Sequence, residues 1–157
     1  MPSLHFTTFI AAPAERVFDL SRNLAVLKYV FNNRKESFSS GAGATLISKG
    51  ETVSVSIKHA GRLRSCMLRL TELTRPVSFT EVQVKGDLEN FRHERHFKRA
   101  DNGTIMIDMI EYGMPRDMVG RILGRFYLKQ YLEKLMLQRN ETIRQYAETE
   151  KWRAVLS

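Results

Sequence analysis

The last third of the chain carries a long helical pattern of hydrophobic positions. Between residues 118 and 146, apolar residues recur at spacings of three and four: Val119, Ile122, Leu123, Phe126, Leu132, Leu135, Met136, Ile143 and Tyr146. The pattern predicts one amphipathic helix, about 45 Å long at about 1.5 Å per residue. That length exceeds what a compact domain of this size needs internally, so the apolar face of the helix requires a broad partner.

Most of the chain before this helix alternates between apolar and polar residues. Strands are predicted around Phe38 and over residues 4–10, 52–58, 66–71, 79–84, 91–98 and 104–112. Asp101-Asn102-Gly103 is a strong hairpin turn, because Asn and Gly tolerate positive φ. The strands therefore predict an antiparallel sheet, which is the broad partner that the long helix needs.

Two short helices are expected between the first and second strands. Pro13 ends the first strand and suits the first turn of a helix, where Glu15 complements the helix dipole. Asn23 can cap a second short helix that carries Leu24, Leu27 and other apolar residues. The predicted class is α+β, with a curved antiparallel sheet wrapped around a long C-terminal helix and two short helices after the first strand.

Length and composition indicate one domain. The 157 residues are 43% apolar, enough for a sizeable core, and we expect a single domain over residues 1–157 whose last residues, 148–157, lose periodicity and fray. No run approaches the eighteen or so apolar residues of a membrane span, and the N-terminus lacks a basic region followed by an apolar one, so we predict a soluble cytoplasmic protein. The single Cys66 lies in an apolar alternation and is predicted to be a small buried hydrophobe.

The net charge of +8 admits nucleic acid or an anionic membrane surface as a partner. Arg121, Arg125 and Lys129 form a basic stripe on the polar side of the long helix, but acidic residues follow and dilute it. No zinc-finger or helix-turn-helix spacing is visible. We therefore favour a solvated helix face and expect no required nucleic acid. A weak contact with a membrane surface stays open. We expect a monomer or a weak dimer.

Neither a metal site nor a nucleotide site is expected. His93 and His96 are three residues apart on a predicted strand, so their side chains point to opposite faces and cannot bind one ion together. The glycine-rich segment 41–45 lacks the Gly-Lys-Ser/Thr ending and the following helix of a phosphate loop. We predict no metal and no cofactor.

A candidate site follows from which residues share one face of neighbouring strands. His93 and Arg95 share a face with two phenylalanines, which indicates that they point inward, and Asp108 shares a face with Met106 on the next strand. The candidate cavity residues are Glu81, Gln83, Phe91, His93, Arg95, Phe97, Met106, Asp108 and Tyr112, joined by Leu123 and Phe126 of the long helix. These polar groups either converge on a ligand or include a buried Arg95–Asp108 pair that merely satisfies itself, and both interpretations stay open.

The order of elements and three segments carry a family resemblance. The segments are 79–86, Phe91-Arg92-His93-Glu94-Arg95-His96-Phe97, and the stretch from Thr104 through Asp108 and Tyr112 to Pro115. Over residues 3–147 the chain resembles the START-like, or SRPBCC, helix-grip superfamily, which includes the birch-pollen allergen fold and bacterial polyketide cyclases. The three segments are similar to an uncharacterised bacterial subgroup with the pattern aromatic-x-His-x-His-x-Phe and later Asp-x-x-x-Tyr-x-x-Pro. Arg95 stands where that pattern has its second His, so no role of that His carries over.

The resemblance implies a deep cavity that holds an apolar molecule, and it implies no single activity. In one class of function the protein is a carrier or sensor for a lipid, polyketide or other hydrophobic metabolite. In another it is a cyclase-like, aromatase-like or hydrolytic enzyme, with His93 or Glu81 as general base and Arg95 or Tyr112 steadying an oxyanion. No nucleophile elbow or cofactor fingerprint supports the second class, so binding is favoured, the catalytic residues stay unassigned, and a basic surface that binds membrane or nucleic acid is a further alternative.

Overall fold

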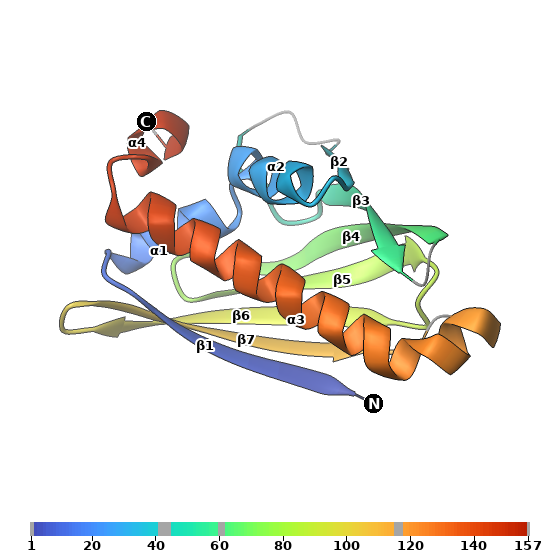
Figure 1. The fold of residues 1–157 in the computed structure, drawn as a ribbon. Helices are drawn as coiled ribbons and strands as arrows, with labels where there is room; N and C mark the ends of the chain where they lie inside the picture. Colours follow the sequence, from blue (N-terminus) through green and yellow to red (C-terminus); the bar gives the residue numbers. More distant parts are fainter. Residues whose placement is uncertain (1, 41–44, 60–61, 115–117, 157) are drawn as a thin grey trace.

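The computed structural model describes residues 2–40, 45–59, 62–114 and 118–156; within these ranges the side chains of residues 57–59, 62–63 and 118–126 are not described. The described strands are Ser3–Ile10 (β1), Ser37–Ser40 (β2), Thr52–His59 (β3), Arg62–Thr74 (β4), Ser78–Gly86 (β5), Phe91–Ala100 (β6) and Gly103–Tyr112 (β7). They form one antiparallel sheet in the order β1-β7-β6-β5-β4-β3-β2 (Figure 1).

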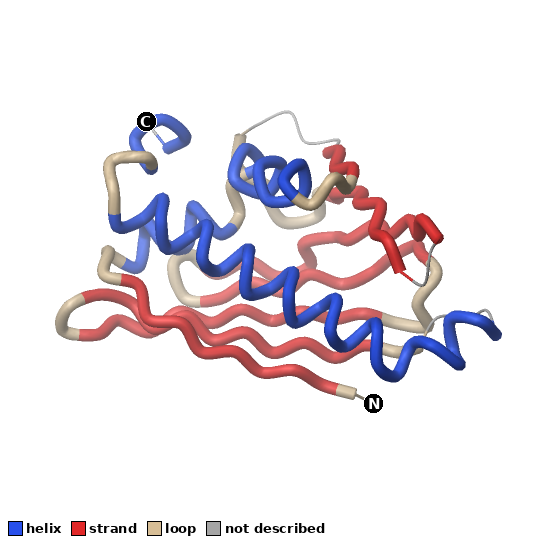
Figure 2. Tube along the Cα trace, viewed as in Figure 1, coloured by secondary structure: helices blue, strands red, loops and turns tan. Residues whose placement is uncertain are grey.

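The described helices are Ala14–Ser21 (α1), Leu24–Asn33 (α2), Met118–Glu148 (α3) and Trp152–Leu156 (α4). Figure 2 shows that they lie on one side of the strands, with α3 running along the curved sheet. The two short helices α1 and α2 follow β1, as expected. The predicted class is therefore confirmed: a curved, unclosed antiparallel sheet holds a long C-terminal helix.

The starts of the two short helices follow from single residues. Pro13 occupies the N-cap of α1 with φ −61°, and Glu15 lies in the first turn. The side-chain oxygen of Asn23 accepts hydrogen bonds from the backbone N–H groups of Ala25 at 2.9 Å and Val26 at 3.1 Å. The predicted Asn cap is confirmed, and it satisfies two N–H groups that a helix start leaves without partners.

The tail after α3 differs from the expected frayed segment over residues 148–157. Trp152–Leu156 forms the short helix α4, whose apolar residues pack against the core beside α1. The guanidinium of Arg16 lies 4.1 Å from the centre of the Trp152 ring, and the Asn23 side-chain amide donates to the carbonyl oxygen of Val155 at 3.0 Å. A helix of five residues is too short to show periodicity, so only its tertiary contacts reveal it.

The interior is filled differently at its two ends. Beneath α1, the Phe18 ring lies 5.7 Å from the Phe79 ring and 5.0 Å from the Phe97 ring, centre to centre, in edge-on contacts. These aromatic residues belong to a continuous buried cluster, which closes this end. At the other end, side chains of α2, β2 and β3 face α3 across a cavity.

Candidate functional site

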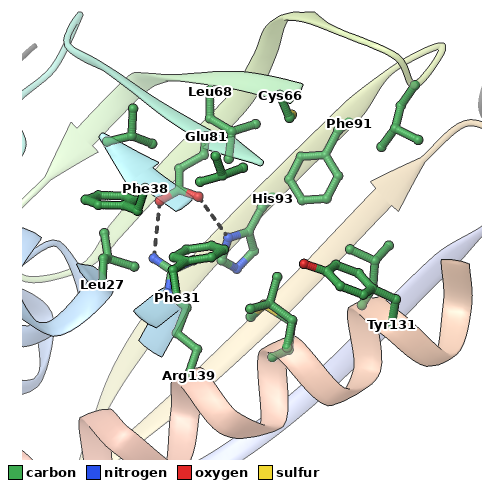
Figure 3. Close-up of a pocket in the computed structure, with 16 residues that line it drawn as sticks. Leu27, Phe31, Phe38, Cys66, Leu68, Glu81, Phe91, His93, Tyr131 and Arg139 are labelled. Atoms are coloured by element: carbon green, nitrogen blue, oxygen red, sulfur yellow. Dashed lines mark hydrogen bonds and ion pairs between the residues drawn. The ribbon is translucent and has the colours of Figure 1, made fainter. Parts of the chain in front are cut away.

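The cavity lies between the sheet, α2 and α3 (Figure 3). The cavity volume is about 70 Å³, and one side of the cavity is open to solvent. The described lining residues are Leu27, Phe31, Phe38, Val53, Val55, Cys66, Leu68, Glu81, Leu88, Phe91, His93, Tyr131, Leu132, Leu135, Met136 and Arg139. Most of them are apolar, so the few polar side chains stand out.

Three charged or titratable side chains meet on one wall of the cavity. In Figure 3 the Glu81 carboxylate from β5 lies between His93 of β6 and Arg139 of α3. Arg139 Nη2 donates to Glu81 Oε1 at 3.3 Å, and His93 Nδ1 faces Glu81 Oε2 at 3.4 Å. Burial alone would raise the pKa of Glu81, but the charge of Arg139 and the contact with His93 hold that pKa below its usual value. Glu81 is therefore an ionised group on the cavity wall.

A second group of polar side chains continues the network away from the cavity. His93 Nε2 lies 2.7 Å from Asp108 Oδ1, and Arg95 Nε donates to the same oxygen at 2.5 Å. Asn140 of α3 accepts from Arg95 Nη2 at 2.6 Å and donates to Asp108 Oδ2 at 2.9 Å. Burial would raise the pKa of Asp108, but Arg95 and His93 hold it below its usual value. Both oxygens of Asp108 are thus engaged inside the protein, the geometry that a self-satisfying Arg95–Asp108 pair requires.

His93 joins the two groups. Each ring nitrogen faces a carboxylate, on Glu81 or on Asp108. Ionised carboxylates only accept hydrogen bonds, so both nitrogens donate only when the ring carries two protons. The ring is buried, with 1% of its surface exposed, yet it forms part of the cavity wall.

Three of the predicted site residues, Glu81, Phe91 and His93, line the cavity. Six others lie elsewhere: Gln83, Arg95, Phe97, Met106, Asp108 and Tyr112. Phe97 and Met106 point inward as predicted but belong to the aromatic cluster under α1. Tyr112 packs with Leu128 and Leu132 of α3, and its burial, together with the charge of Glu133, raises its pKa. Residues at alternate positions of a strand share one face of the sheet. This spacing predicts that a side chain faces inward, but it does not predict whether that side chain lines the cavity.

Gln83 departs from its expected position because the strands diverge. β5 pairs with β6 only over residues 78–82, so Gln83 lies just beyond the paired part. Its side-chain amide donates to the carbonyl oxygen of Leu88 at 2.9 Å and accepts from the Cys66 thiol at 3.3 Å. The predicted Leu123 and Phe126 lie on α3, but their side chains are outside the described residues.

Arg139 and Asn140 were missed by the sequence prediction although a signal exists. Arg139 lies three residues after Met136 and four before Ile143, within the apolar stripe of α3. Both residues are buried, at 7% exposed for Arg139 and 3% for Asn140. A polar residue at a core-facing helical position is the pattern that could have identified them.

Tyr131 was also missed, and it lies across the cavity from Glu81. Its hydroxyl donates to Glu36, which follows α2, and the guanidinium of Arg34 lies 4.8 Å from the centre of its ring. Burial and the bond to Glu36 raise the pKa of Tyr131. The aromatic face of Tyr131 is thus held in place by the segment between α2 and β2.

Two kinds of feature are absent from the residues that the structure describes. No group of three or more His, Cys, Asp or Glu side chains in that part of the chain is arranged to hold a metal ion. No described helix is long and apolar enough to cross a membrane.

Comparisons with known proteins identify the fold. No family model and no curated protein matches the sequence. Among solved structures, the protein TTHA0849 of Thermus thermophilus is 19% identical with a TM-score of 0.68, covering 99% of this chain and 100% of that one. The major latex-like protein of Panax ginseng is 12% identical with a TM-score of 0.64, covering 94% of this chain and 98% of that one.

A third similar structure is the Zhui aromatase/cyclase of a Streptomyces species, 15% identical with a TM-score of 0.65, covering 94% of this chain and 93% of that one. Likeness at such identity concerns the fold alone. The element order, the unclosed sheet and these neighbours agree with the resemblance read from the sequence. The chain therefore has the helix-grip fold of the START-like, or SRPBCC, proteins.

Proposed function

We propose that this protein binds a small apolar molecule in the cavity between sheet and α3, as a carrier or sensor. One observation carries the proposal: a largely apolar cavity has a small polar group, Glu81, His93 and Arg139, at one wall. Ligand sites commonly combine an apolar lining with a few polar groups that orient the ligand, in clefts of about 300–1,000 Å³. The cavity of this structure, at about 70 Å³, is smaller than that range and is open on one side.

The ligand is a lipid, a polyketide or another hydrophobic metabolite. Glu81, Phe91 and His93 contact it, together with Arg139 and Tyr131, while Arg95 and Asp108 support the wall behind His93. The cavity volume of about 70 Å³ favours a small or slender molecule over a bulky one. For Leu123 and Phe126 the proposed contact rests on helical spacing alone.

A second candidate is a cyclase-like or hydrolytic enzyme in the same cavity. It is favoured by His93, an imidazole at the cavity wall with a carboxylate at each ring nitrogen, an arrangement suited to a general acid or base. The similarity to the structure of an aromatase/cyclase also supports the enzyme candidate. An enzyme would convert its bound compound with time, whereas a carrier returns it unchanged, and mass spectrometry of the compound extracted after incubation separates the two.

The binding proposal is tested with the neutral fluorescent probe N-phenylnaphthylamine. Its fluorescence should rise on titration with the protein, and Leu135→Trp, which fills the cavity, should weaken binding by about tenfold or more, equivalent to ~1.4 kcal/mol. Leu137→Trp is the matched control, because Leu137 lies two residues further along α3 and is 60% exposed. Circular dichroism verifies that both variants fold.

Two results would contradict the binding proposal. One is a wild-type protein that leaves the probe fluorescence unchanged. The other is a folded Leu135→Trp variant that binds the probe as tightly as Leu137→Trp, because the probe would then sit outside the cavity.

A further inference from the structure

We propose that the polar end of the ligand is a carboxylate, and that Arg139 binds it at the cavity wall. This inference rests on the proposed function and adds the chemical class of the ligand: an amphipathic acid rather than a neutral molecule. Arg139 comes from the apolar stripe of α3 and meets Glu81 and His93 from the sheet (Figure 3).

The guanidinium of Arg139 is buried but not saturated. Its side chain is 9% exposed, and Nη2 donates to the carbonyl oxygen of Ser21 at 3.1 Å and to Glu81 at 3.3 Å. Its Nε has no hydrogen-bond partner in the described structure. A buried N–H without an acceptor costs stability, and an arginine fork matches the two oxygens of a carboxylate. A ligand carboxylate would supply the missing acceptor.

The contacts of Arg139 are also looser than those deeper in the network. The two contacts of Glu81, with Arg139 and His93, measure 3.3 and 3.4 Å, whereas Asp108 is contacted at 2.5–2.9 Å. Charge-assisted hydrogen bonds between nitrogen and oxygen are usually about 2.7–2.9 Å. Arg139 can therefore donate a hydrogen bond to a ligand without breaking a tight ion pair.

The charges and contacts around His93 favour an anion over a cation. Four ionised groups surround His93. Glu81 of β5 and Asp108 of β7 contact its ring, and these carboxylates pair with Arg139 of α3 and Arg95 of β6. These two carboxylates and two guanidiniums cancel, so the four groups carry no net charge that would repel an anion. Glu81 is less suited to bind a cationic ligand, because both of its oxygens have a partner whereas Arg139 Nε has none in the described part of the chain.

The test compares two competitors with the same chain, decanoic acid and decanol, for displacement of N-phenylnaphthylamine at neutral pH, where the acid is ionised. Wild-type protein should prefer the acid by about tenfold or more, ~1.4 kcal/mol. Arg139→Gln should reduce this preference to less than about threefold, ~0.6 kcal/mol. Arg144→Gln, an exposed arginine on the same helix, should keep the full preference.

Glu81→Gln supplies an independent result, since it removes the carboxylate that competes with the ligand for Arg139. The preference for the acid should then rise above that of the wild type. If Arg139→Gln does not fold, this variant decides, and an unchanged or lower preference overturns the proposal.

The remaining outcomes separate the two proposals. Equal displacement by decanol and decanoic acid in the wild type overturns the carboxylate proposal and leaves the binding proposal standing. A probe that does not bind, with neither competitor having an effect, contradicts the binding proposal itself.

Discussion

The polar network inside the sheet has two parts that differ in what lies beside them. The sealed part, Arg95, Asp108 and Asn140, is 0–3% exposed and is held by contacts of 2.5–2.9 Å. The cavity part, Glu81 and Arg139, is 7% exposed and is joined at 3.3 Å, with His93 between the two parts. Each part pairs an arginine with a carboxylate. Each arginine leaves one nitrogen without a hydrogen-bond partner among the described residues, Arg95 Nη1 and Arg139 Nε, but of the two arginines only Arg139 lines the cavity, where a ligand can reach it.

The largest effect is expected in the sealed part. Asp108→Ala leaves the buried guanidinium of Arg95 without its carboxylate, and breaking one partner of a buried pair costs about 3–5 kcal/mol. Urea denaturation measures the loss. Glu94→Ala, which removes a half-exposed pair with Arg92 on the other face of the same strand, should cost less than about 1 kcal/mol. A similar loss in both variants would show that burial of the pair contributes nothing.

A dependence on acid should follow from the same carboxylates. The pKa values of Asp108 and Glu81 are held below their usual values, so the unfolded chain binds more protons than the folded one in acid. Their contribution is present above the unfolded-state pKa of about 4 and is lost as pH falls below it. Urea midpoints measured from neutral pH downward should fall steeply for the wild type and less steeply for Asp108→Asn. Parallel curves for the two proteins would contradict this account.

Removing the carboxylate of the cavity part should lower the free energy of unfolding less than Asp108→Ala does. Glu81→Ala is expected to lower stability by about 1–3 kcal/mol, since water that enters the cavity can solvate the freed guanidinium of Arg139. The measurement is the same urea denaturation as for Asp108→Ala. A loss at Glu81 equal to or larger than that at Asp108 would remove the distinction between the two parts.

The smallest effect is expected at Cys66, on the apolar wall of the cavity. Burial raises the pKa of this thiol to about 12, so the reactive thiolate is scarce at neutral pH. Iodoacetamide should modify it much more slowly in the folded protein than in urea, and saturating N-phenylnaphthylamine should slow the reaction a further few-fold. Modification of the folded protein at the rate seen in urea would show that the wall is open at this point.

Strand periodicity explains why part of the site is visible in the sequence. Residues two apart on a strand share a face, so an inward-facing Phe97 indicates that His93 and Arg95 also face inward. The hairpin turn at 101–103 then sets the register in which Arg95 lies opposite Asp108. The pairing of these two residues was predictable because every interaction behind it is between neighbouring strands.

The partners from α3 were not predictable in the same way. Whether Arg139 and Asn140 meet Glu81 or Asp108 depends on how the helix is rotated and placed on the sheet, which sequence spacing does not specify. The same holds for the tail, where the tertiary contacts of Trp152 and Val155 form a helix too short to be recognised by periodicity.

The sequence by itself determined the elements and their inward faces: the strands of the sheet, the Asn23 cap, the long helix and the inward side of β6 and β7. Only the tertiary structure decided which inward residues are sealed and which border empty space. The Phe18 side chain fills the space between α1 and the sheet, whereas Glu36 holds Tyr131 at the far side of the cavity. Such a choice depends on contacts between residues far apart in the chain, and local periodicity carries no information about them.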